Sequence, residues 1–257
     1  VSPFGKIRLG GNDATADYSF MSWLAMLFAA GMGIGLMFWS VAEPAAYFTG
    51  WYETPLGVEP NTPEAARLAM GATMYHWGLH PWAIYAVVSL SLAFFCYNKG
   101  LPLSIRSIFY PILGDRAWGW PGHIIDILAV LATLFGLATS LGLGAQQAAA
   151  GINHVFGTDA GIGLQIGVIT GVTLLAVISV VRGIDGGVKL LSNVNMVIAF
   201  VLLVFVGVVG FAAAFGNIPN TVMGYVENII PLSNPHGRED ETWMHGWTVF
   251  YWAWWIS

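Results

Sequence analysis

The chain has 257 residues, of which 56% are hydrophobic and 9% are charged, and its mean hydropathy is +0.68. Soluble chains carry about 25% charged residues, so this composition excludes an ordinary soluble domain and indicates an integral membrane protein. The apolar runs are long enough for bilayer-spanning helices, and we predict an all-α polytopic bundle rather than a barrel. The net charge of −5 gives no indication of a nucleic-acid partner, and a single cysteine, Cys96, excludes an internal disulfide.

Apolar runs predict five complete membrane spans and an incomplete sixth. In chain order they cover about 19–42, 66–97, 124–150, 162–181, 188–215 and, incompletely, 243–257. Two shorter segments, at about 103–113 and 219–231, have the composition of helices on the membrane surface. The last run is too short to cross a bilayer, and Val1 opens a sequence without a basic leader. We therefore expect the sequence to be a piece of a longer protein, cut within a membrane helix.

Basic residues gather in alternate loops between the predicted spans. Such loops face the cytoplasm, so we expect the residue 1 end inside the cell and the protein in the cell (inner) membrane. The loops with most acidic residues would then face outward. The basic residues of the cytoplasmic set are Lys6, Arg8, Lys99, Arg106, Arg116, Arg182 and Lys189.

The first span contains three glycines in five residues, at Gly31, Gly33 and Gly35. Each interior glycine weakens a helix by roughly 1 kcal/mol relative to alanine. Gly31 and Gly35 have the spacing of a helix-packing face, but Gly33 lies about 200° away from Gly31. We favour a locally unwound helix, whose open carbonyls and amides could hold an ion or a substrate, and keep helix packing as the alternative.

Aromatic residues concentrate in the second and the sixth spans. Trp77, Trp82 and Tyr85 fall at about 0°, 140° and 80° around an ideal helix, within one broad face. An aromatic belt at the membrane interface is one interpretation. The other is a cage for a quaternary ammonium group, whose methyl-shielded charge is best met by ring faces. The aromatic residues of the sixth span are Phe250, Tyr251, Trp252, Trp254 and Trp255.

Few other residues indicate chemistry. His76 and His80 have the i, i+4 spacing of a metal site but no nearby third ligand, so we interpret them as ordinary hydrogen-bonded histidines. We expect Asp126 to stabilise the start of its helix and the charge of Glu43 to lie at the membrane interface, with gating as the alternative for Glu43. The sequence has no nucleophile–base pair and no nucleotide motif, so we predict neither an enzyme nor a cofactor.

Three motifs together resemble the betaine/carnitine/choline transporter family. They are GMGIGLMFWSVAEP, HWGLHPWAIY and WTVFYWAWWIS, in this order and at these separations. The resemblance covers essentially the whole chain. It implies a LeuT-type fold of two inverted five-helix repeats, of which this chain would hold the first repeat and the start of the second.

The resemblance also implies a substrate cage built from two spans. Trp77, Trp82 and Tyr85 would surround a trimethylammonium group, and Trp255 would close the cage. The permeation path would be lined by Phe250, Trp252 and Trp254.

The glycine stretch would carry the hinge and a sodium site in such a protein. Gly31, Gly33 and Gly35 would form the hinge, Met32 would touch the substrate, and backbone carbonyls of Ala29 and Met32 would bind sodium. Proton-coupled choline transporters of the family carry Asp at the position of Gly35, so the glycine favours sodium coupling and a zwitterionic substrate.

A second sodium site of the family uses two threonines one helical turn apart. This chain has Thr133 but carries Leu137 at the partner position, which puts that site in doubt.

The implied function is secondary active import of a quaternary-ammonium osmolyte, with glycine betaine favoured and Na⁺ as the coupling ion. Proton-coupled or exchange transport of choline, carnitine or another compatible solute is the alternative. An ion channel and a membrane-embedded enzyme that uses His76 and His80 are more remote alternatives. Membrane lipid is an expected partner, and a homotrimer is an expectation from the family.

Overall fold

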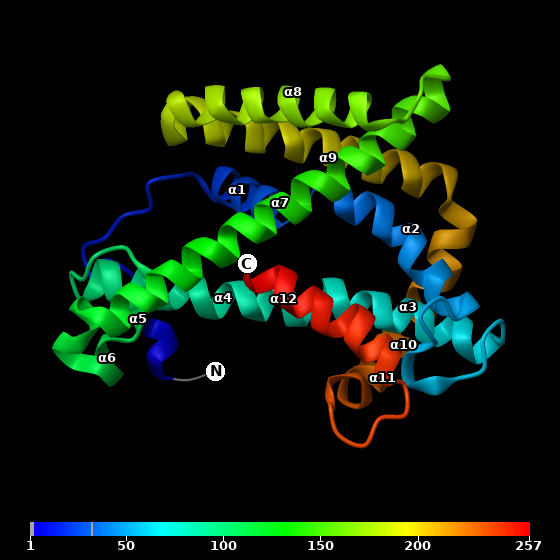
Figure 1. Ribbon diagram of the computed structural model, residues 1–257, viewed down its shortest axis with the longest axis horizontal. Helices are drawn as coiled ribbons and strands as arrows, with labels where there is room; N and C mark the ends of the chain where they lie inside the picture. The colour runs from blue at the N-terminus through cyan, green and yellow to red at the C-terminus, as the bar shows by residue number, and fades with distance from the viewer. Residues whose placement is uncertain (1–2, 32) are drawn as a thin grey trace. The chain divides into compact units, whose positions relative to one another are not determined.

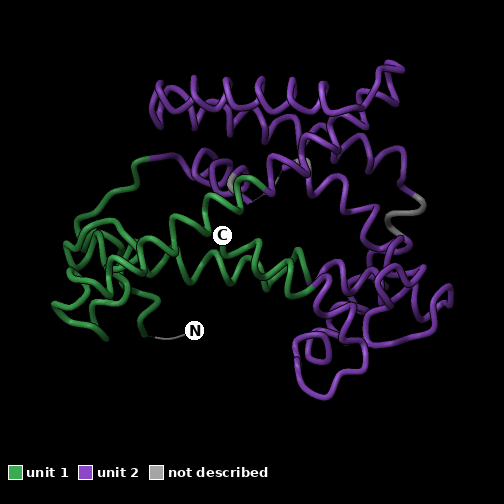
Figure 2. Tube along the Cα trace, in the orientation of Figure 1, with its two compact units in different colours: residues 1–17, 76–138, 248–257 green, residues 18–75, 139–247 purple. Residues whose placement is uncertain are grey.

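The computed structural model describes residues 3–31 and 33–257, and none of these residues forms a strand (Figure 1). The chain divides into two compact units, each assembled from segments far apart in sequence (Figure 2). Unit 1 comprises Val1–Asp17, His76–Ala138 and Thr248–Ser257, and unit 2 comprises Tyr18–Tyr75 and Thr139–Trp247. A 3-10 turn, η1, covers Pro3–Lys6 at the beginning of unit 1.

Four helices of the described residues are long and apolar enough to cross a membrane. A shorter apolar helix at Phe20–Ala29 precedes them. The apolar side chains of these helices are largely exposed, as expected for surfaces that lipid covers. The four candidate spans are Pro63–Asn98, Trp120–Phe156, Ile162–Val181 and Ile184–Val209.

The first predicted span is interrupted at its glycine stretch. Helix α1 covers Phe20–Gly31 and α2 covers Ile34–Thr49, with Gly33 in an extended conformation (φ −137°, ψ −158°) before α2. Helix α2 runs beyond the predicted end near residue 42 and contains Pro44. It ends at Gly50, whose positive φ of 78° ends a helix at little steric cost.

The second predicted span, expected as one helix, is broken as well. After a short 3-10 turn at Pro55–Gly57 (η2), α3 covers Pro63–Trp77, α4 covers Leu79–Ala93, and a π turn (η3) extends it over Phe94–Asn98. Gly78 between α3 and α4 has non-helical angles (φ −96°, ψ −125°). The cause is Pro81, which has no N–H and whose ring collides with the carbonyl four residues earlier, that of Trp77.

The predicted surface helix at 103–113 is two short helices in the structure. They are α5, Ile105–Ile108, and α6, Tyr110–Leu113, followed by a 3-10 turn over Gly114–Trp118 (η4). Pro111 explains the division, because a continuous helix would need an N–H at this position. Helix α7 then covers Trp120–Phe156, so it begins earlier and ends later than the predicted span.

The remaining helices of unit 2 begin with α8, Ile162–Val181, which matches the predicted bounds. A π turn at Ile184–Val188 (η5) leads into α9, Lys189–Val209, and α1 packs along α9 (Figure 1). The predicted span at 188–215 is divided at Gly210. The predicted surface helix at 219–231 is part of α10, Phe211–Ser233.

The last elements lead back into unit 1. Helix α11 covers Glu241–Trp243, a π turn (η6) covers Met244–Val249, and α12 covers Phe250–Ile256. In unit 1, α12 packs along α4, and this contact brings together the two aromatic-rich segments of the sequence (Figure 1).

Candidate functional site

The four residues predicted to form the cage lie in continuous ring contact within unit 1. The rings of Trp77 and Trp255 are 4.9 Å apart at an interplanar angle of 80°. Tyr85 contacts Trp255 edge-to-face at 6.0 Å, and Trp82 contacts Tyr85 at 5.8 Å. We call these residues the cage. Trp255 is buried, whereas the other three rings are half-buried and keep accessible surface.

A second layer of rings supports Trp255 from its own helix. Trp254 stacks on Trp255 at 5.3 Å, and Tyr251 stacks on it at 6.0 Å. Tyr251 also meets Trp77 at 5.6 Å and is 1% exposed. Tyr251 was predicted only as one of the aromatic residues of the sixth span, although its i, i+4 spacing to Trp255 indicates contact on one helix face.

The remaining aromatic residues predicted for the path lie around this layer. Trp252 stacks on His80 at 5.6 Å and meets His76 edge-on at 5.6 Å. Phe250 contacts Trp254 at 5.7 Å and is largely exposed.

The helix break at Gly78 provides a hydrogen-bond acceptor beside the cage. The last carbonyls of a helix have no intrahelical partner. One of them, the carbonyl of His76, accepts a hydrogen bond from Trp255 Nε1 at 3.1 Å. The ring of His76 makes a second hydrogen bond, between Nε2 and Thr248 Oγ1 at 3.0 Å. His76 and, through its contact with Trp252, His80 therefore both meet α12 or the turn before it. The described residues contain no group of three or more potential ligands for a metal.

The cage has the chemistry of a cation site without a counter-charge. None of the four residues is acidic, so a bound cation would meet ring faces rather than a carboxylate. A cation over an aromatic face gains about 0.5–2 kcal/mol, with the larger value when both are out of water. Such a site favours a cation that cannot donate hydrogen bonds.

The residues predicted for the hinge and the sodium sites lie in unit 2 or on α7. Gly31 ends α1, Gly33 precedes α2, and Gly35 lies in the first turn of α2. Ala29 is in the last turn of α1, where carbonyls lack intrahelical partners. Met32 lies outside the described residues.

Thr133, predicted for the second sodium site, lies on α7. Its hydroxyl donates to the carbonyl of Ala129 at 3.0 Å, and Leu137, one turn later, is exposed.

Unit 2 contains another aromatic cluster, which the sequence analysis did not predict. Tyr47 meets Trp247 at 4.9 Å and Trp243 at 5.3 Å. Glu43 is fully buried beside them and accepts a hydrogen bond from the Tyr47 hydroxyl at 2.6 Å. Glu43 is therefore enclosed by protein, and its position at the membrane interface stays a prediction. We call Glu43, Tyr47, Trp243 and Trp247 the unit 2 cluster.

A buried ion pair adjoins the unit 2 cluster. Arg238 donates to both carboxylate oxygens of Asp240, at 2.8 and 2.5 Å, and its guanidinium lies 5.3 Å from the Trp243 ring centre. Asp240 also accepts from the backbone N–H of Leu56 at 2.7 Å. Arg238 and Asp240 therefore pair with each other inside the protein.

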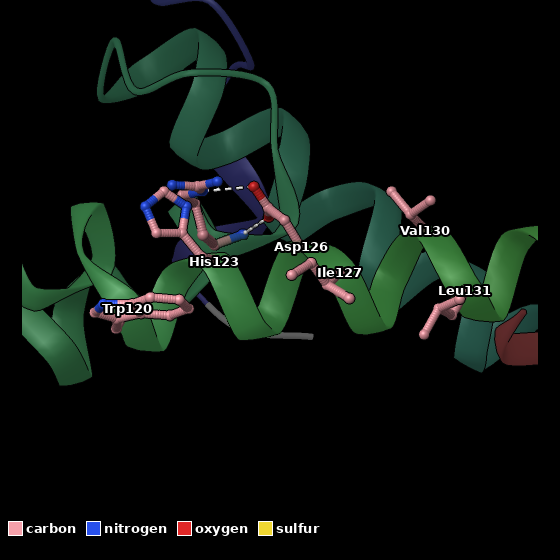
Figure 3. Close-up of a pocket in the computed structure, with 7 residues that line it drawn as sticks. Trp120, His123, Asp126, Ile127, Val130 and Leu131 are labelled. Atoms are coloured by element: carbon pink, nitrogen blue, oxygen red, sulfur yellow. Dashed lines mark hydrogen bonds and ion pairs between the residues drawn. The ribbon is translucent and has the colours of Figure 1, made fainter.

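A separate cavity of about 460 Å³ opens beside the start of α7 in unit 1 (Figure 3). Its polar wall is an ion pair in which Arg106 Nε donates to Asp126 Oδ2 at 2.5 Å. Because α7 begins at Trp120, Asp126 is not in the first turn, and the predicted stabilisation of a helix start is wrong. The rest of the lining is mainly apolar. The lining residues are Arg106, Trp120, His123, Asp126, Ile127, Val130 and Leu131.

Comparison with known proteins gives a match over the whole chain. Residues 1–257 match the family described as betaine/carnitine/choline family transporter, BCCT. The chain is 82% identical over 257 residues to glycine betaine transporter 1 of Vibrio parahaemolyticus, covering 100% of this chain and 49% of that protein. It is 72% identical over 256 residues to a glycine betaine/proline/choline/ectoine transporter of the same organism, covering 100% of the chain and 46% of the relative.

A more distant relative matches over the same region. A glycine betaine transporter of Bacillus subtilis is 45% identical over 260 residues, covering 100% of this chain and 50% of that protein. The chain thus spans about half the length of the curated relatives it matches.

Proposed function

Because the chain belongs to the betaine/carnitine/choline transporter family, we propose that the complete protein imports a small quaternary-ammonium osmolyte across the cell membrane. Glycine betaine is the proposed substrate, since relatives at 82% and 45% identity are named glycine betaine transporters. The observation that carries the proposal is the cage, where Trp77 of one helix and Trp255 of another meet at 4.9 Å.

The chemistry of the substrate explains why a cage of this kind suits it. A trimethylammonium group has a positive charge but no N–H, so it cannot form the hydrogen bonds that a carboxylate or carbonyl site would offer. Ring faces attract the charge and pack against the methyl groups at the same time. An uncharged wall also suits a zwitterion, because it leaves the substrate carboxylate free of repulsion from an acidic side chain.

Sodium-coupled symport is the proposed mechanism. The interruption between Gly31 and Ile34 supports it, because carbonyls at a broken membrane helix can replace the water around a cation. Ala29 and Met32 are the proposed carbonyl donors. Glycine rather than a carboxylate at position 35 favours sodium over proton coupling. Sodium would stabilise one arrangement of the broken helix, and substrate in the cage would then be released on the other side after the bundle rearranges.

Uptake by the complete protein in liposomes tests the proposal. Radiolabelled glycine betaine should enter only with an inward sodium gradient, and uptake should saturate. Trp77→Ala should raise KM about 5- to 30-fold, the loss expected for one cation–π contact of 1–2 kcal/mol. The matched control is Trp120→Ala, which removes an exposed indole of unit 1 outside the cage.

Two results would overturn the proposal. One is an unchanged KM in Trp77→Ala. The other is sodium-independent flux that does not saturate, which is the behaviour of a channel.

A broader substrate range is a second candidate. It is favoured by the 72% identical relative, whose name includes proline, choline and ectoine. Competition of labelled betaine uptake by each of these solutes separates the two candidates, since a betaine-specific cage would leave uptake unaffected.

A further inference from the structure

We propose that His76 is a positioning residue that holds α12, and with it the indole of Trp255, in the geometry of the cage. This inference rests on the proposed function, because the cage is the site whose geometry it concerns. His76 itself is outside the cage. It precedes Trp77 and lies two residues before the helix break at Gly78.

The first observation is that His76 contacts every position of one stripe on the last segment of the chain. Residues 248, 251, 252 and 255 follow the i, i+3, i+4, i+7 spacing of a single helix face. His76 Nε2 bonds Thr248 Oγ1 at 3.0 Å, and its carbonyl accepts from Trp255 Nε1 at 3.1 Å. Between these two points its ring stacks on Tyr251 at 4.7 Å and meets Trp252 at 5.6 Å.

The two hydrogen bonds fix the segment at both ends of the stripe. Thr248 and Trp255 are seven residues apart, about two helical turns or 10 Å along the axis. One bond alone would leave the segment free to rotate about it. Two bonds to the same residue, with a stacked ring between them, determine both the rotation and the axial position of α12 on the α3–α4 break.

The hydrogen bond between His76 and Thr248 is buried, so losing it is costly. His76 is 0% exposed and Thr248 is 6% exposed, so neither side chain can exchange its partner for bulk water. A buried polar group that loses its partner retains the cost of its desolvation. Thr248 also lies in the π turn Met244–Val249, and such turns are frequent at functional sites.

The effect on Trp255 follows from its hydrogen bond. With Nε1 held by the carbonyl of His76, the indole has one orientation, and in it the ring lies edge-to-face with Trp77 at 80°. The acceptor is available because the helix is broken at Gly78. His76 therefore determines the orientation of the Trp255 ring, although His76 itself is not part of the cage.

Paired substitutions at Thr248 in the complete protein test the proposal. Thr248→Val removes the hydroxyl with little change of volume, and Thr248→Ser keeps it. We expect Thr248→Val to raise the KM of betaine uptake, and the Kd from tryptophan fluorescence, about three- to tenfold with Vmax within twofold. Thr248→Ser should restore both constants to within twofold of the wild type. Thr170→Val is the matched control, because its hydroxyl donates only to the carbonyl of Ile166 on α8, on the exposed side.

A double-mutant cycle tests whether the two residues act together. If they do, His76→Ala combined with Thr248→Val should raise KM no more than His76→Ala alone. Multiplying effects would overturn the proposal. If His76→Ala does not accumulate as folded protein, the Val and Ser variants at position 248 decide the question by themselves.

Three further outcomes are informative. A lower melting temperature of Thr248→Val with unchanged KM and Kd would mean a purely structural role and would overturn the proposal. If KM and Kd are unchanged in Thr248→Val, while the wild type transports betaine and Trp77→Ala raises the KM of uptake, only the positioning role is overturned. If the wild type binds no methylated ammonium compound, the proposed function and the positioning role are both overturned.

Discussion

The cage and the unit 2 cluster are two groups of aromatic rings with the same closest approach and different chemistry. The nearest rings are 4.9 Å apart in both, Trp77 with Trp255 and Tyr47 with Trp247. The unit 2 cluster encloses the carboxyl group of Glu43, and Tyr47 and Trp243 have no exposed surface. In the cage, Trp77, Trp82 and Tyr85 keep accessible surface and no carboxylate is present.

This difference shows that a high density of tryptophan and tyrosine does not by itself identify a ligand site. The cage differs from the unit 2 cluster because its rings keep accessible surface and because it contains no acidic side chain. In the unit 2 cluster, the buried carboxyl group of Glu43 already forms its hydrogen bond within the protein, with the Tyr47 hydroxyl. We therefore expect substitutions in the unit 2 cluster to change stability and substitutions in the cage to change substrate affinity.

The largest expected effect concerns the buried ion pair beside the unit 2 cluster. Asp240→Ala should lower the free energy of unfolding by about 3–5 kcal/mol, because it leaves the guanidinium of Arg238 buried without its counter-charge. The side chains of this pair are 5% and 2% exposed. Arg67→Ala is the control, since it removes an ion pair with Glu227 whose side chains are 50% and 45% exposed, and should cost less than about 1 kcal/mol.

Denaturation in detergent measures both free energies of unfolding. Equal losses for the two variants would contradict the distinction between a buried and an exposed pair. The KM of folded Asp240→Ala protein should remain that of the wild type.

An intermediate effect is expected for tyrosine hydroxyls. Tyr47→Phe removes a donor to the buried carboxylate of Glu43 and should destabilise the protein by about 1–3 kcal/mol. Tyr85→Phe keeps the ring of a half-buried cage residue and should change stability by less than about 0.5 kcal/mol. Thermal unfolding of the two variants checks this, and a larger loss for Tyr85→Phe would reverse the roles assigned to the two groups of rings.

A smaller effect on stability than that of Asp240→Ala is expected for Trp255→Phe, which keeps an aromatic face but removes the N–H bonded to the carbonyl of His76. The lost hydrogen bond is worth about 0.5–1.5 kcal/mol, and the smaller ring also loses packing contacts at this buried position, so the melting temperature should fall moderately. The Kd for betaine should nevertheless rise about threefold or more, because the ring is no longer held in one orientation. A normal Kd would show that its orientation is unimportant for binding.

Two features of the sequence predicted the cage residues, the helical spacing of aromatic residues and the family resemblance. Helical spacing placed Trp77, Trp82 and Tyr85 on one face of a continuous helix, which is wrong for Trp77, because the break at Gly78 puts it on α3 and the other two on α4. The structure nevertheless joins Trp82, Tyr85 and, through Trp255, Trp77 in ring contact. Spacing could not show that Trp255, from another helix, lies among them. Only the family resemblance suggested that, and the roles of these residues in binding stay predictions.

The two features that the sequence did not predict have different causes, one local and one long-range. The break at Gly78 depends on a clash between Pro81 and a carbonyl, which a hydropathy window does not register. The burial of Glu43 depends on Trp243 and Trp247, about 200 residues further along the chain. A glutamate next to a proline at the end of an apolar run does not reveal this burial, because the residues that enclose it are distant in the sequence.

By itself, the sequence determined that this is a polytopic helical membrane protein and that its aromatic residues and glycines lie in particular spans. These properties follow from composition and spacing within one segment, since a bilayer imposes the same length and polarity on every helix that crosses it. The tertiary structure alone decided which rings meet, which aromatic group has closed over a carboxyl group, and that His76 contacts residues more than 170 positions away. Those outcomes depend on packing between distant segments, which no local pattern specifies.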